Sequence, residues 1–198
     1  MGMSPASFAV SELIEVARRC NPNLDAIRAI TWQAAGPVEE SWQQWLDGVF
    51  EPLLLPHLRR VLDFSARQSS KEIILLDLDL DRNLDPWTRD KSLDAGTRFL
   101  RQATLRAERL MVKLHEAIDS GIAFGHFATL YAVRCGTFSI PVRTAILSYV
   151  LQELVVGAPV DIKPVKYLEA AVESVNEFLR MSSDGVNEGL RFHGRNSC

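Results

Sequence analysis

The stretch ILLDLDLDRNLDPWTRD, residues 74–90, decides how the chain is interpreted, because acidic or amide side chains stand at every second position of its central part. These residues are Asp77, Asp79, Asp81, Asn83 and Asp85. An EF-hand calcium loop begins in a similar way, but it needs glycine at its sixth position and glutamate at its twelfth. Counted from Asp77, those positions hold Arg82 and Thr88. The spacing therefore does not predict a calcium site.

Two regular conformations fit this stretch better than a loop does. A helix places four apolar residues on one face, namely Ile73, Leu76, Leu80 and Leu84, and sets Asp77, Asp81 and Asp85 beside them. Like charges four residues apart cost a helix about 0.2–0.5 kcal/mol, which is the weakness of this interpretation. A strand would instead align Ile74, Leu76, Leu78 and Leu80. The pattern favours a helix over residues 71–84 and leaves a strand open.

Helical spacing and helical end signals recur along the rest of the chain. Asp85 and Pro86 suit a helix start, because aspartate accepts from free backbone N–H groups and proline has none to satisfy. The steps that follow predict one long helix with the stripe Leu93, Gly96, Leu100, Ala103, Ala107, Leu110 and Leu114. Pro141 and Gly157 bracket another helix. Pro164 precedes a third helix, with the stripe Val165, Leu168, Val172, Val175 and Leu179.

Length and composition describe one globular domain. The 198 residues are 47% hydrophobic and 24% charged, which suits a single core. The predicted fold is an all-α, single-domain bundle of about seven to ten helices over residues 1–181. Residues 182–198 are polar and contain glycine, so we expect a mobile C-terminal tail there.

The same totals argue against several classes of partner. A chain with net charge −3 lacks the clustered basic surface that nucleic-acid binding requires. The longest apolar run, residues 145–160, contains Gln152 and Glu153, so no membrane span is predicted. The three cysteines, Cys20, Cys135 and Cys198, are far apart and odd in number, which fits a reducing compartment. No leader pattern opens the chain, and we expect a cytoplasmic protein.

Few patterns in the sequence suggest chemistry. His115-Glu116 resembles the start of the zinc-protease H-E-x-x-H motif, but Asp119 stands where the second histidine is needed. The sequence shows no phosphate loop, G-x-S-x-G elbow or Cys/His nucleophile pair. The residues therefore predict neither an active site nor a cofactor. A metal-binding helical protein using His115, Glu116, Asp119 and His126 is a minor alternative.

The predicted long helix also carries basic residues on the side away from its apolar stripe. They are Arg98, Arg101, Arg106, Arg109 and Lys113. A solvated face is the simpler interpretation of these charges, and docking of an acidic protein partner is the functional one. Gly96 lies on the apolar stripe itself. Glycine inside a helix costs about 1 kcal/mol relative to alanine, which indicates the close approach of another helix.

At this helix the chain resembles the urease accessory protein F family, an all-α family of nickel-enzyme maturation factors. The family carries an acidic, leucine-rich helix followed by the pattern Arg-x-x-Ser-x-x-x-Gly, which Arg89, Ser92 and Gly96 match. The similarity extends to an N-terminal segment and to a histidine-led helix that ends in glycine. The matching residues there are Phe8, Ser11 and Glu15, then His126 and Gly136. The chain departs from the family at Leu13 and Tyr131, where the family has glycine.

The resemblance implies a scaffold rather than an enzyme. Members of the family dimerise, bind a second accessory protein called D or H, and recruit with it a small GTPase that delivers nickel to apo-urease. We therefore expect a homodimer without a cofactor, nickel and GTP being held by partner proteins. The candidate partner-binding residues, besides the N-terminal helix, are Arg98, Arg101, Arg106, Arg109, Arg191, Phe192 and His193. The alternative function is a helical adaptor or regulatory protein unrelated to urease.

Overall fold

The computed structural model describes residues 10–21, 31–32, 34, 36–102, 108–157 and 164–192, with side chains described as far as residue 182. Every regular element in these ranges is helical, which confirms the all-α prediction. In chain order they are α1 (Val10–Cys20), α2 (Val38–Trp45), the π-helix η2 (Leu46–Leu54), α3 (Leu55–Ala66), α4 (Ser70–Asn83), α5 (Pro86–Leu100), α6 (Arg109–Asp119), α7 (Phe127–Thr137), α8 (Val142–Gly157) and α9 (Pro164–Phe192). Three candidate residues, Phe8, Arg106 and His193, lie outside the described ranges, as do the side chains of Arg191 and Phe192.

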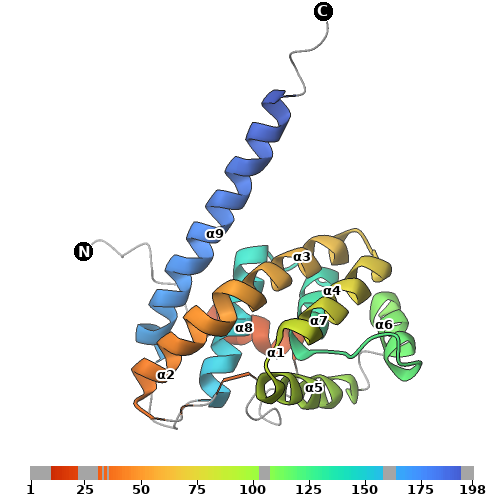
Figure 1. The fold of residues 1–198 in the computed structure, drawn as a ribbon, viewed down its shortest axis with the longest axis horizontal. Coiled ribbons are helices and arrows are strands. Elements are labelled where there is room, and N and C mark those ends of the chain that lie inside the picture. The colour runs from red at the N-terminus through yellow and green to blue at the C-terminus, as the bar shows by residue number, and fades with distance from the viewer. Residues whose placement is uncertain are drawn as a thin grey trace, which may run out of the picture.

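The helices α7 and α8 form the centre of the bundle. Residues 127–135 of α7 and 145–154 of α8 are all buried, which is the pattern of a helix surrounded by others. The helices α3 and α5 pack on α7, while α1 and α9 pack on α8. Figure 1 shows these outer helices around the two central ones. Tyr131 and Tyr149 are among the largest fully buried side chains and lie 6.0 Å apart between ring centres.

The elements α2, η2 and α3 follow one another as a single helical rod (Figure 1). The sequence predicts helix here but not the widened π-helical segment. Pro52 lies inside that segment, and an α-helix would bring its ring against the carbonyl of Gly48. The wider turn accommodates the proline, and at its end the N–H of Leu55 donates to Phe50 O, five residues back. Before the proline, the rings of Trp42, Trp45 and Phe50 are stacked in sequence.

The helix-or-strand question for residues 71–84 is resolved as helix α4. Its buried residues are Ile73, Leu76, Asp77, Leu80 and Asp81. The predicted apolar face is therefore present, and two of the aspartates expected beside it, Asp77 and Asp81, are buried with it. Asp85 caps α5 as predicted, accepting from the N–H groups of Trp87 at 3.0 Å and Thr88 at 3.1 Å.

The predicted long helix is wrong, because α5 ends at Leu100 and α6 begins at Arg109. The buried residues of α5 are Thr88, Ser92, Ala95, Gly96 and Phe99. Leu93 and Leu100, which the stripe predicted as core, are only half-buried. Directly after α5 the side chain of Gln102 is buried and donates to Asn21 Oδ1 at 3.0 Å. This long-range hydrogen bond fixes the point at which the chain leaves the helix.

The last helix, α9, starts at Pro164 as the sequence predicts. Leu168, Ala171 and Val175 are buried against the body. The helix continues to Phe192, so the domain boundary predicted after residue 181 does not mark a helix end. Its C-terminal part runs beyond the body in Figure 1. Within the described ranges, no helix has both the length and the apolar character of a membrane span.

Candidate functional site

A buried carboxylate joins α4 to the start of α7. Asp77 is 1% exposed and accepts hydrogen bonds from three successive backbone N–H groups, those of Phe124 (2.8 Å), Gly125 (2.8 Å) and His126 (3.0 Å). Thr129 Oγ1 donates to the same carboxylate at 2.7 Å. The N–H groups at a helix start usually find a capping side chain just before the helix. Here a residue from another helix performs that task and holds the loop before α7 in place.

Asp81, one turn further along α4, binds a second pair of groups. Its Oδ1 accepts from Arg89 Nε at 2.6 Å and lies 3.2 Å from His126 Nε2. Because a carboxylate oxygen only accepts, Nε2 of His126 carries the proton. Burial lowers the pKa of His126 below its usual value, although the charges of Asp77 and Asp81 oppose this effect. His126 is therefore a neutral hydrogen-bond donor at neutral pH.

His57 extends this cluster into α3. Its Nε2 lies 3.0 Å from Thr129 Oγ1. Since the one hydroxyl proton of Thr129 is directed to Asp77, His57 must donate to the threonine oxygen. Burial is the main reason that the pKa of His57 falls to about 3. We call Asp77, Asp81, Arg89, His126, Thr129 and His57 the α4–α7 cluster. Its neutral imidazoles and hydrogen-bonded carboxylates are suited to holding helices together.

Two glycines set the distances between helices around this cluster. A Cβ atom on Gly96 of α5 would lie 1.9 Å from Gly125 O, in the loop that Asp77 holds. A Cβ atom on Gly136 of α7 would lie 2.5 Å from Ser65 Cβ on α3. The close approach predicted at Gly96 is confirmed. The approaching segment, however, is the loop before α7 rather than another helix.

The residues that carry the family resemblance fall into two groups. Arg89, Ser92, Gly96 and His126 are brought together where α4, α5 and α7 meet, and Gly136 lies near the far end of α7. Arg89 also covers the ring of Phe124, with its guanidinium carbon 5.4 Å from the ring centre. Ser11 and Glu15 are instead exposed on α1, one turn apart and away from the cluster.

An apolar groove lies between α1 and α9. Its volume is about 140 Å³, and it is lined by Val10, Leu13, Val165, Leu168, Glu169, Val172 and Glu173. We call it the α1–α9 groove. Among the lining residues, Val165 is 54% exposed, and Glu169 and Glu173 are exposed acidic residues. The groove therefore presents apolar surface next to negative charge, which suits contact with another protein.

Comparison with known proteins identifies the family. The UreF family model matches residues 38–155, which cover more than half of the chain, from α2 almost to the end of α8. The chain belongs to the UreF family. Membership gives it a role as a urease accessory protein, in a family of accessory factors rather than enzymes. No curated protein and no solved structure matches the chain.

The UreF match includes the whole α4–α7 cluster and leaves out both helices of the α1–α9 groove. The family pattern in this chain thus describes the interior that shapes the bundle. The exposed groove is formed by the flanking helices.

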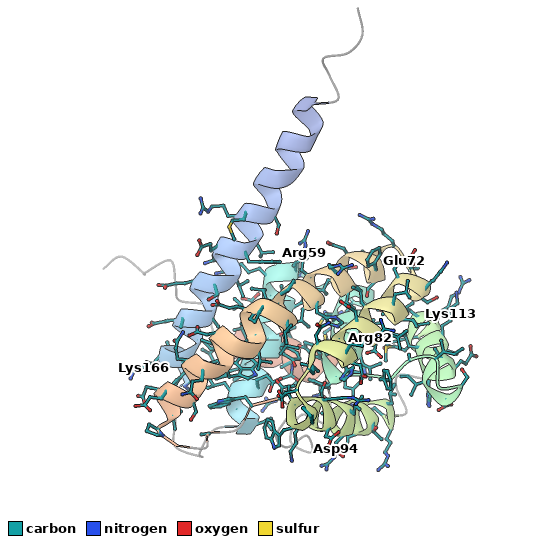
Figure 2. The ribbon with its side chains drawn as sticks, in the orientation of Figure 1. Arg59, Glu72, Arg82, Asp94, Lys113 and Lys166 are labelled. Atoms are coloured by element: carbon teal, nitrogen blue, oxygen red, sulfur yellow. The ribbon has the colours of Figure 1, made fainter. Side chains whose placement is uncertain are left out.

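The basic residues of this UreF-family chain do not form the single helix face that the sequence suggests. Arg98 lies in α5 and pairs with Asp94 at 2.8 Å, and Arg101 follows the end of that helix. Arg109 begins the separate helix α6. Figure 2 shows Lys113 of α6 and Asp94 of α5 on different sides of the body. The prediction of one continuous arginine face therefore fails with the prediction of one continuous helix.

The metal-binding alternative for this UreF-family chain is also not supported. His115 pairs with Asp119 at 3.6 Å on the surface of α6, whereas His126 is buried in the α4–α7 cluster. Across the described residues, no group of three or more His, Cys, Asp and Glu side chains could hold a metal ion. The structure therefore does not bring His115, Glu116, Asp119 and His126 together as one set of ligands.

Sequence reasoning missed Asp77, Asp81 and Thr129 as the centre of the UreF interior. For the aspartates the available signal was helical spacing: Asp77 stands four positions after Ile73 and three before Leu80, and Asp81 stands three before Leu84. It also missed Glu153, which is fully buried in α8. Glu153 accepts from Thr31 N (2.8 Å), Thr31 Oγ1 (2.5 Å) and Tyr149 OH (2.6 Å). Burial raises the pKa of Glu153 to about 7.

Proposed function

We propose that this UreF-family chain is a scaffold in urease maturation. In this role it binds a urease accessory D/H protein and a maturation GTPase, and the assembly inserts nickel into apo-urease. Nickel and GTP are held by the partners, and the scaffold acts as a homodimer. Family membership supports the urease role, and the resemblance described above is the source of the named partners.

The observation that carries the proposal is the position of the family residues at the junction of α4, α5 and α7. Ser92, Gly96 and His126 are buried there, and the half-exposed Arg89 is bound to the buried Asp81. Arg89 and His126 meet at Asp81 Oδ1, and Asp77 accepts from three backbone N–H groups and from Thr129. A chain whose distinctive residues shape its interior acts through the surface that this interior supports. We therefore place its function in protein contacts.

The α1–α9 groove and the exposed side of α1 are the proposed docking surface. Ser11 and Glu15 lie exposed on α1, and the acidic edge of the groove comes from Glu169 and Glu173. Apolar centres with a polar edge are typical of protein interfaces. A partner segment with apolar residues flanked by lysine or arginine would complement this surface.

Co-expression tests the proposal directly. The full chain is produced with the D/H protein and the maturation GTPase of the same source, and the purified material is analysed by size-exclusion chromatography with light scattering. We expect one species that contains all three proteins and two copies of the UreF-family chain. A chain that elutes alone as a monomer in the presence of both partners contradicts the proposal.

Surface variants locate the docking site. Glu15→Arg and Val165→Glu reverse or add charge at exposed positions of the proposed surface, and we expect each to weaken the complex while the fold persists. Glu116→Arg on α6 is the matched control, because Glu116 is exposed and distant in sequence from both helices. Arg98→Glu and Arg109→Glu test the basic surface separately. If these two variants weaken the complex while Glu15→Arg and Val165→Glu leave it unchanged, the partners bind at α5 and α6 instead.

A further inference from the structure

A pocket lies between the helical rod and α4, and we call it the α3–α4 pocket. Its volume is about 280 Å³. Residues of η2 and α3 form one wall, and residues of α4 form the other. The helices α3 and α4 pack against each other on this side of the bundle (Figure 1). The pocket shares no lining residue with the α1–α9 groove, so it is a separate feature of the surface.

His57 is the most deeply buried polar residue of the α3–α4 pocket, at 6% exposed. Its Nε2 donates to Thr129 Oγ1 in the interior, so Nδ1 is the unprotonated ring nitrogen with a free lone pair. Among the described residues, no group donates a hydrogen bond to His57 Nδ1, and this atom is not enclosed by protein as His126 Nδ1 is. The pocket therefore offers a ligand one neutral hydrogen-bond acceptor.

The walls around His57 are apolar. Leu76 and Leu80 of α4 are buried, and Leu53 and Pro56 on the opposite side are half-buried. Small-molecule pockets are lined mainly by such side chains, and a few polar groups in them fix the orientation of the ligand. The α3–α4 pocket can therefore hold the apolar body of a ligand whose donor group reaches His57.

Two exposed side chains of opposite charge complete the lining. Arg60 comes from α3 and Asp79 from α4. Among the described residues, neither one forms an ion pair, whereas the adjacent Arg59 pairs with Asp63 at 3.1 Å. One positive and one negative group are thus available at the mouth of the pocket.

We propose that the α3–α4 pocket binds a small free amino acid whose side chain is a hydroxyl-bearing aromatic ring, as in tyrosine. The hydroxyl donates to His57 Nδ1, and the ring lies between the apolar walls. The carboxylate of the ligand pairs with Arg60 and its ammonium group with Asp79. The proposal goes beyond the role in urease maturation and does not depend on it.

The lining discriminates against other classes of ligand. Asp79 disfavours a ligand that carries only negative charge, and Arg60 disfavours one that carries only positive charge. An aromatic ligand without a hydroxyl leaves His57 Nδ1 without a donor. A volume of about 280 Å³ is at the lower end of the roughly 300–1,000 Å³ typical of ligand pockets. The pocket is therefore suited to a molecule of amino-acid size.

Nuclear magnetic resonance titration of the full chain, labelled with ¹⁵N, tests the proposal with L-tyrosine as the probe. We expect shifts confined to the amides of residues 52–60 and 76–83, and a shift of His57 Nδ1 as this atom accepts a hydrogen bond. L-Phenylalanine should bind about two- to tenfold more weakly, which is the value of one hydrogen bond, and should leave the Nδ1 resonance in place. Absence of shifts with tyrosine, or an equal response to phenylalanine, overturns the proposal.

A second probe separates a free amino acid from a tyrosine within a partner protein. N-Acetyl-L-tyrosinamide keeps the phenol and lacks both charges, so we expect it to bind several times more weakly than tyrosine. Equal binding of the two probes overturns the free amino acid as ligand and assigns the pocket to a tyrosine side chain of a protein.

Charge variants provide the matched comparison. Arg60→Gln and Asp79→Asn each remove one charge from the mouth of the pocket, and we expect each to weaken tyrosine binding about two- to fivefold, as for an exposed ion pair. Arg59→Gln is the control, because Arg59 is the neighbouring residue and does not line the pocket. None of these three side chains is buried, so the variants do not require repacking of the core. Equal affinities of all three variants overturn the assignment of Arg60 and Asp79.

Discussion

Asp77 on α4 and Thr129 on α7 are 52 positions apart in sequence and share a hydrogen bond of 2.7 Å in the interior. The same carboxylate accepts from the backbone of Phe124, Gly125 and His126. One side chain therefore satisfies the start of a buried helix and the loop before it. Since buried N–H groups are costly to leave without partners, the position of α7 depends on α4.

Asp77→Asn should destabilise the protein by about 3 kcal/mol, because the amide replaces two charged acceptors with one neutral acceptor and one donor. Backbone N–H groups before α7 would then face an N–H₂ group. Urea unfolding followed by circular dichroism measures the change. Asp79→Asn is the control, since Asp79 is exposed on the same helix; it should change the free energy of unfolding by less than about 0.5 kcal/mol. Equal effects of the two variants would contradict this role of Asp77.

Gly96→Ala should destabilise the protein by about 3 kcal/mol. Its new methyl group would lie 1.9 Å from Gly125 O, and backbone cannot move aside as a flexible side chain does. Gly48→Ala is the matched control, because nothing lies within 4 Å of a Cβ atom there. We expect this control to be neutral or to stabilise by up to about 1 kcal/mol. Thermal unfolding of both variants shows whether the steric contact at Gly96, rather than the general effect of replacing a helical glycine, determines the change in stability.

Glu153 should make stability depend on pH in the neutral range. Its pKa is about 7 in the folded protein, against an ordinary value of 4.5. Folding therefore favours the protonated form, and this contribution is complete below pH 4.5 and is lost as the pH rises through 7. The loss is on the order of 3 kcal/mol. In Glu153→Gln the amide can face Thr31 and Tyr149 without titrating, so its free energy of unfolding should fall less than that of the wild type over this range.

His57 should act in the opposite direction at acidic pH. Its pKa falls from 6.5 to about 3 on folding, so the folded state disfavours the charged imidazole. The stability is present above pH 6.5 and is lost as the pH falls toward 3. His57→Gln keeps a donor for Thr129 and should lose less stability on acidification. Urea unfolding at a series of pH values measures the change, and identical pH profiles of the wild type and His57→Gln would contradict the role of His57.

Local signals predicted the helix starts correctly. Asp85 is the N-cap of α5, and Pro141 and Pro164 stand where α8 and α9 begin. In each case, the information lies within one turn of the residue concerned. Short-range chemistry of this kind is present in the sequence and needs no knowledge of the fold.

Long-range contacts explain what the sequence could not reveal. The break after Leu100 involves the buried Gln102 and its partner Asn21, far earlier in the chain. Asp77 and Asp81 were placed only beside the apolar face, and charged side chains are rarely buried without partners. Their partners come from a different helix and loop, and no local pattern indicates them. Glu153 was likewise interpreted only as a charged residue that interrupts the apolar run 145–160, because its partner Thr31 is far away in the sequence.

The π-helix η2 has an effect on the register of the helical rod. A turn closed over five residues holds one residue more than an α-helical turn, and each residue rotates the side-chain direction by about 100°. The tryptophans of α2 and His57 of α3 therefore point in directions that an uninterrupted α-helix would not give. Deleting one residue from 46–54 while the five-residue turn persists would rotate α3 relative to α7. Since Leu46, Phe50 and Leu54 of η2 are buried, such a change of length would act as a core mutation.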